Sequence, residues 1–121
     1  MDNKLTDNIF NSIKELLGPT AADESFDNEI LMDLNGAIMI LTQIGIGDMG
    51  FTIVSKEETW TDFGINEADL ALVKPYLYLK TKKVFDPPVS TVLLQSMDNQ
   101  INEYEWRLRT RAEIELGKGA G

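Results

Sequence analysis

The sequence predicts an all-α fold: a four-helix domain with a long C-terminal helix and one short extended segment. Apolar residues recur at spacings of three and four through most of the chain, which is the period of amphipathic helices. Glycine and proline interrupt this pattern, most sharply at Gly18-Pro19 and at Asp86-Pro87-Pro88. Neither a repeat nor a second apolar core is visible, so residues 1–121 are expected to form one domain.

Two helices are expected in the first half of the chain. Thr6 or Asp7 can cap the first helix, and the Gly-Pro pair ends it. Ser25 is the expected cap of the second helix. Residues 30–44, which form its body, are apolar on nearly every side. A helix of that kind is usually buried, so we expect it to be the central helix.

The sequence Gly45-Ile46-Gly47-Asp48-Met49-Gly50 has the spacing of the dinucleotide fingerprint G-x-G-x-x-G. That fingerprint requires a strand before it and a helix after it. Here a helix is expected before it, and the strand-like residues 51–54 follow. We therefore interpret the glycines as a helix stop and a loop. Trp60 and Phe63 are expected on a short helical turn that closes one end of the core.

The third helix is expected to begin at the Asn66 cap and to contain Pro75, which should kink it. Pro87-Pro88 then forces a reversal of the chain. The last helix should run from residue 91 to about residue 116, or roughly 39 Å. A domain of this size has a radius of gyration of about 14 Å. Part of the last helix should therefore lie outside its own core.

The core is predicted from the apolar faces of these helices. Along the last helix the apolar stripe consists of Leu94, Met97, Ile101, Tyr104 and Leu108. The main core residues are expected to be Phe10, Ile13, Ile30, Leu34, Ile38, Leu41, Leu70, Val73, Leu77, Ile101 and Tyr104. Residues 117–121 are expected to be a flexible tail.

The composition and charge of the chain exclude several classes of function. The net charge is −9, and it divides into −11 for residues 1–70 (14 acids, 3 bases) and +2 for residues 71–121 (6 acids, 8 bases). An acidic surface repels nucleic acid, so specific DNA binding is not expected. The chain has neither cysteine nor histidine, which removes thiol chemistry and the usual general base. Its longest apolar segment, residues 36–41, is much shorter than the roughly 20 residues of a membrane span.

Two minor alternatives concern the acidic residues. Asp23, Glu24, Asp27 and Glu29 suggest calcium, but an EF-hand loop starting at Asp23 would lack its required glycine and glutamate. An enzyme that uses only carboxylates is the other possibility. Because the acids are expected at helix starts and on solvated faces, we predict no enzyme activity, no cofactor and no metal.

Several short sequences together resemble a known family. They are Ser25-Phe26-Asp27, Leu41-Thr42-Gln43-Ile44-Gly45, Thr59-Trp60-Thr61-Asp62-Phe63, Tyr78-Leu79-Lys80, Phe85-Asp86-Pro87-Pro88 and Glu105-Trp106-Arg107-Leu108. In this order and spacing they resemble the small head-tail connector (adaptor) proteins of long-tailed bacteriophages, over roughly residues 5–112.

The resemblance implies a structural virion protein at the head-tail interface, assembled in the host cytoplasm. Its subunits would form a homo-oligomeric ring of about twelve, a dodecamer, between the portal protein and the stopper or another tail-proximal protein. DNA would pass through the ring without specific binding. The alternative function is a helical partner-binding protein outside the ring, such as a tail assembly chaperone.

The C-terminal helix holds the expected partner-binding residues. Trp106 lies about 200° around the helix from Tyr104 on the apolar stripe, so a monomer would expose it. Exposed tryptophan beside arginine is favoured at interface hot spots. The predicted partner-binding set is Tyr104, Trp106, Arg107, Arg109, Arg111 and Glu113. The alternatives are a solvated helix held by pairs such as Glu105/Arg109 and Arg109/Glu113, or Trp106 folded back over Trp60 or Phe63.

Overall fold

The computed structural model describes residues 4–120, with side chains to residue 115. Its helices are α1 (Ile9–Leu17), α2 (Asp27–Ile44), α3 (Trp60–Phe63), α4 (Glu67–Phe85) and α5 (Thr91–Ala120). Two short 3₁₀ turns, η1 (Pro19–Ala21) and η2 (Glu24–Phe26), join α1 to α2. The part of the chain that the structure describes contains no strand, and the all-α prediction is confirmed.

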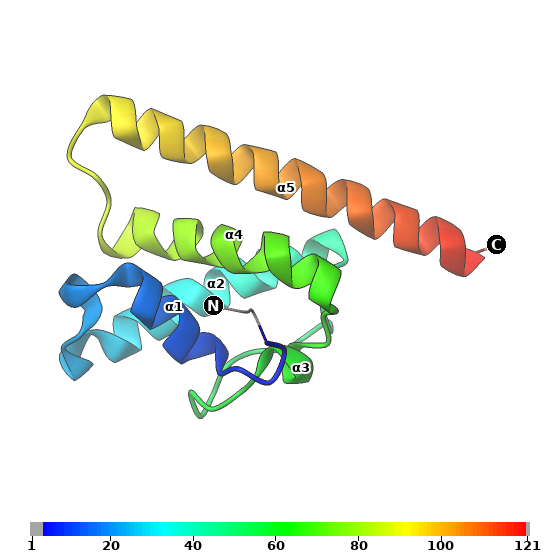
Figure 1. Cartoon of the computed structure of the whole chain (residues 1–121), viewed down its shortest axis with the longest axis horizontal. Helices are drawn as coiled ribbons and strands as arrows, with labels where there is room; N and C mark the ends of the chain where they lie inside the picture. The colour runs from blue at the N-terminus through cyan, green and yellow to red at the C-terminus, as the bar shows by residue number, and fades with distance from the viewer. Residues whose placement is uncertain (1–3, 121) are drawn as a thin grey trace.

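The central helix is α4, and the expectation that α2 would be central is wrong. Helices α1 and α2 pack on one side of α4, and α5 lies along its other side (Figure 1). Helix α2 contacts α4 with one face, while Met32 and Met39 on its opposite face are exposed. The apolar character of α2 on nearly every side therefore reflects a core face together with an apolar surface.

The core agrees closely with the prediction. Ten of the eleven predicted core residues are buried, and Tyr104 is half-buried against them. Trp60 and Phe63 are fully buried, as expected, and Phe63 stacks on Phe51 with ring centroids 4.9 Å apart. At Gly47 a Cβ atom would lie 2.3 Å from the Phe63 ring, and φ is 78°. Only glycine fits this close approach of the loop to the core.

Two helix starts differ from the sequence prediction. Asn8, not Thr6 or Asp7, caps α1, because its side chain accepts a hydrogen bond from the Asn11 N–H at 3.0 Å. Ser25 does not cap the second helix. Asp23 accepts the Ser25 N–H at 2.9 Å and caps η2, and α2 begins only after that turn. The predicted Asn66 cap of α4 is confirmed.

Residues 51–54 form no strand, although their sequence is strand-like. The amide side chain of Asn35 on α2 pairs with the backbone of Ile53: Nδ2 donates to its carbonyl at 3.0 Å, and Oδ1 accepts its N–H at 2.8 Å. A side chain thus satisfies this extended backbone. The isolated bridge between Asn8 and Thr59 is the β-type pairing found in the described chain.

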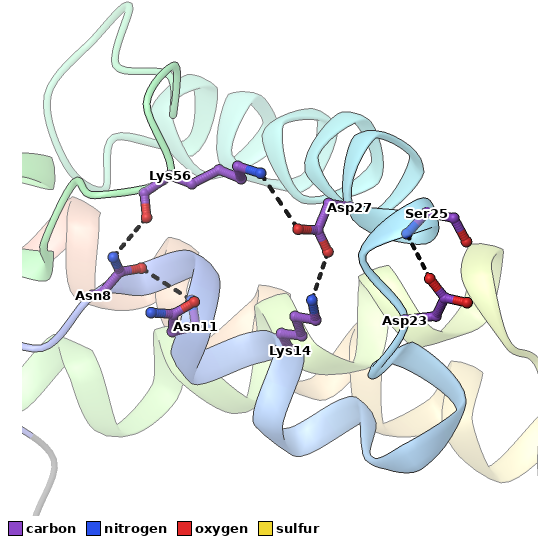
Figure 2. A network of polar contacts seen from close by, with 7 residues as sticks. All are labelled: Asn8, Asn11, Lys14, Asp23, Ser25, Asp27 and Lys56. Carbon is purple, nitrogen blue, oxygen red and sulfur yellow. Dashed lines mark hydrogen bonds and ion pairs between the residues drawn. The ribbon is translucent and has the colours of Figure 1, made fainter.

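Asp27, one residue of the acidic cluster at the start of α2, is part of a structural network (Figure 2). The Asp27 carboxylate accepts from Lys14 of α1 at 2.7 Å and from Lys56 of the 53–59 loop at 3.3 Å. Asn8 donates to the carbonyl of Lys56 at 2.6 Å. The hydrogen bond from Lys14 holds the pKa of Asp27 below its usual value. These contacts join α1, α2 and the loop through the Asp27 carboxylate.

Helix α5 follows the chain reversal at Asp86-Pro87-Pro88. Ser90 caps the helix, its Oγ accepting the Leu93 N–H at 3.3 Å. At 30 residues α5 is about 45 Å long. Its C-terminal end projects past the rest of the molecule (Figure 1). The helix continues beyond the expected end near residue 116, and the side chains of the predicted flexible tail, residues 117–121, lie outside the described residues.

Candidate functional site

The inner face of α5 is held against α4 by a continuous apolar stripe. Met97, Ile101 and Leu108 are buried, as predicted, and Leu94 and Tyr104 of the same stripe are half-buried. The stripe continues one turn further than expected, to Ala112, which packs over the C-terminal end of α2 near Gly45. Beyond Ala112 the described side chains of α5 are exposed.

Two polar contacts fix the register of α5 on α4. The buried Tyr76 hydroxyl donates to the Glu105 carboxylate at 2.8 Å. Burial, with the nearby Glu105 carboxylate, raises the pKa of Tyr76 well above its usual value. Arg111 pairs with the buried Asp69 at 2.5 Å. Each contact places a polar group beside apolar residues, so sliding α5 along α4 would leave both carboxylates without these partners.

The structure divides the predicted partner-binding set. Arg111 pairs with Asp69 of its own chain, and Tyr104 packs against the core. Trp106 is 66% exposed, and Arg109 and Glu113 are exposed as well. Arg107 forms a surface pair with Glu103 at 3.0 Å, a contact that a partner can replace at little cost. Partner binding by the six residues stays a prediction, now centred on the exposed members.

Trp106, Arg109 and Glu113 are spaced three and four residues apart and lie on one face of α5. We call these three residues, with the flanking Arg107, the Trp106 face. Trp106 does not fold back over Trp60 or Phe63, which are buried in the core and 1% and 0% exposed. Glu105 accepts a hydrogen bond from Tyr76, and among the described side chains neither Glu105 nor Glu113 forms an ion pair with Arg109. Arg109 is therefore available on the same face as the tryptophan.

A second surface was not predicted from the sequence. The outer face of α2 and the loop after it form a groove of 710 Å³, lined by Met32, Met39 and Met49 among other residues. The three methionines are 69%, 57% and 76% exposed. The signal was present in the sequence, because a helix that is apolar all round but has only one buried face must expose apolar residues. Which face would be exposed depended on tertiary packing.

The described residues were compared with the patterns of a metal site and of a membrane-spanning helix. Among the residues that the structure describes, no three acidic side chains lie together in an arrangement that could hold a metal ion. None of the described helices combines the length and the hydropathy needed to cross a bilayer. The exposed aromatic-basic face of α5 and the apolar groove of α2 are both typical of protein-protein contacts.

Comparison with known proteins assigns the family. A family model described as "Phage connector protein" matches residues 9–115, which includes every helix from α1 to the Trp106 face. Searches of curated proteins and of solved structures found no match. The family match agrees with the resemblance inferred from the tryptophan, Phe-Asp-Pro-Pro and Glu-x-x-Trp motifs. This chain belongs to the phage connector protein family.

Proposed function

We propose that the chain is the head-tail connector (adaptor) subunit of a long-tailed bacteriophage. About twelve copies form a ring that joins the portal protein to the stopper or tail and surrounds the DNA channel. The family match over residues 9–115 carries this proposal. Proteins of this family are structural components of the virion, and the chain acts here as a mechanical joint rather than as an enzyme.

The structure supports this role through α5. Its inner face is fully used by α4, while the Trp106 face is turned to solvent and its end projects from the molecule (Figure 1). A projecting helix with an exposed tryptophan and arginines is suited to insertion into a neighbouring protein. We assign this helix face to contact with the portal or with the adjacent subunit.

The charge of the chain is compatible with DNA transport. At −9 per subunit, a ring of about twelve copies surrounds the channel with negative potential. Such a surface lacks the clustered lysines and arginines that bind phosphates, so the DNA moves through the channel without being retained. The function therefore requires no specific contact with bases.

Co-purification with the portal protein of the same phage tests this function. We expect the chain to bind the portal ring and to assemble on it, and native mass spectrometry would give the number of copies. A chain that remains monomeric beside an intact portal would contradict the proposal. A chain that instead binds a tail component during assembly and is absent from finished virions would be an assembly chaperone.

A further inference from the structure

Three polar contacts join α4 to α5. From the turn between the helices toward the free end of α5, the pairs are Lys83 with Asp98, Tyr76 with Glu105, and Asp69 with Arg111. Their α4 members are seven residues apart, a spacing at which side chains lie on nearly the same side of a helix. The contacts therefore hold α5 along one side of α4 over most of the length of α4 (Figure 1).

The two contacts farther from the turn lie on either side of a buried leucine. Glu105, Leu108 and Arg111 follow one another at steps of three residues, and each step turns an α-helix by about 300°, or about 60° short of a full turn. Leu108 is 0% exposed and lies between the two polar residues, about 60° from each. A polar contact on each side of a buried side chain restricts the rotation of α5 about its own axis as well as its sliding along α4.

The rotation of α5 determines where Trp106 points. Trp106 precedes Leu108 by two residues and lies about 160° around the helix from it. While Leu108 is held in the core, Trp106 is turned away from the molecule, and it is 66% exposed. A different rotation of α5 would move the indole and change the surface that is offered to a partner.

We propose that Tyr76, Asp69 and Arg111 are positioning residues, which hold α5 in the rotation that presents Trp106 to its partner. This inference rests on the proposed function, in which that partner is the portal or the adjacent subunit. Arg111 belongs to the predicted partner-binding set, but here it acts through Asp69 of its own chain and does not contact the partner.

The size of the effect follows from the population of the correct rotation. When one contact is removed, α5 can occupy other rotations, and the apparent Kd rises in proportion to the lost fraction of the binding-competent one. A hydrogen bond to a charged group is strong enough to change such a population by about tenfold. We therefore expect the loss of the contact between Asp69 and Arg111 to raise the Kd for the portal ring about tenfold.

A double-mutant cycle tests whether Arg111 acts through Asp69. Asp69→Ala, Arg111→Ala and the double variant are titrated onto the portal ring as full chains. Asp69 is only 8% exposed, so it contributes almost no surface to a partner. If the pair acts as one positioning unit, each single variant and the double variant should raise the Kd by a comparable factor, because the second substitution removes nothing more. Arg111→Lys can form the ion pair again and should regain most of the affinity. Tyr76→Phe removes only the hydroxyl and should also weaken binding.

Lys56→Ala is the matched control for the loss of an ion pair. Lys56 pairs with Asp27 on the side of α4 away from α5, and the side chains of Asp27 and Asp69 are each 12% exposed. Urea unfolding of all the variants separates a loss of stability from a loss of binding. The control should bind the portal ring like the parent, even where its stability is lowered as much as that of Asp69→Ala.

Several results would overturn the positioning role. Weaker binding by Arg111→Ala with unchanged binding by Asp69→Ala would show that Arg111 contacts the partner directly, and a double variant much weaker than either single variant would show the same. Parent-like binding by both single variants, or an equal loss in Lys56→Ala, would show that the contact serves stability alone. In each of these cases the parent still binds the portal and the proposed function stands. If the parent does not bind, the proposed function and the positioning role fail together.

Discussion

Replacement of Trp106 by alanine is expected to weaken portal binding strongly while leaving the fold intact. Trp106 is 66% exposed, and a buried tryptophan covers up to about 250 Å². Docking would therefore remove about 165 Å² of Trp106 surface from water. At about 25 cal/mol per Å² this area corresponds to about 4 kcal/mol, an upper value that ordering costs reduce. A loss of about 2 to 4 kcal/mol corresponds to a Kd raised about 30-fold to 800-fold.

The assay is titration of purified chain onto the portal ring, with affinity measured at two salt concentrations. Leu16→Ala is the matched control, because Leu16 is an exposed apolar residue, 45% exposed, on α1 and outside both the Trp106 face and the groove of α2. Far-UV circular dichroism and thermal unfolding would show that both variants remain folded. If Trp106→Ala folds normally and binds as tightly as the Leu16→Ala control, the Trp106 face is only a solvated support and its assignment is wrong.

Three further predictions concern the fold and the assembly of the ring. Leu41→Ala and Leu77→Ala should each lower the free energy of unfolding by about 2 to 5 kcal/mol in urea titrations, since both side chains are fully buried; losses under about 1 kcal/mol would contradict the packing. Replacing Pro87 and Pro88 with alanine should preserve monomer folding but impair ring assembly, because the direction of α5 is no longer fixed; equal assembly would refute this. Partial burial raises the pKa of Glu58, but hydrogen bonds from backbone N–H groups outweigh it and lower the pKa to about 2. The ionised carboxylate should therefore stabilise the fold fully above pH 4.5, and this stabilisation should be lost as the pH falls toward 2. Glu58→Gln should flatten that part of the curve of unfolding free energy against pH.

The helices and their ends could be predicted from local sequence because the determining groups are close along the chain. Gly18 and Gly45 end helices with positive φ, and Asn66 caps α4 through a residue three positions away. Residues 51–54, predicted as a short extended segment, form no strand because a strand needs a partner and the described chain supplies the side chain of Asn35 instead. Local preference was overridden there by a contact 18 residues distant.

In the candidate site, too, features set by neighbouring residues could be predicted and features set by distant contacts could not. The exposure of Trp106 followed from helix geometry alone, since its angle to the apolar stripe is fixed by sequence spacing. The pairing of Arg111 with Asp69 joins residues 42 positions apart and could not be read from the spacing of charges along one helix. The groove lined by Met32, Met39 and Met49 likewise depends on where the loop after α2 is placed, and the hydrogen bond from the Asp48 N–H to the Phe63 carbonyl contributes to that placement. The sequence identified Trp106 as exposed, but it did not show which arginines of α5 are already paired within the same chain.

Cryo-electron microscopy of purified virions tests the central claim most directly. The account predicts a ring of this chain between the portal and the tail, with α5 recognisable by its length of about 45 Å and the Trp106 face against the portal or the adjacent subunit. Density for the chain elsewhere in the particle, or virions that lack the chain, would contradict its assignment as the head-tail connector.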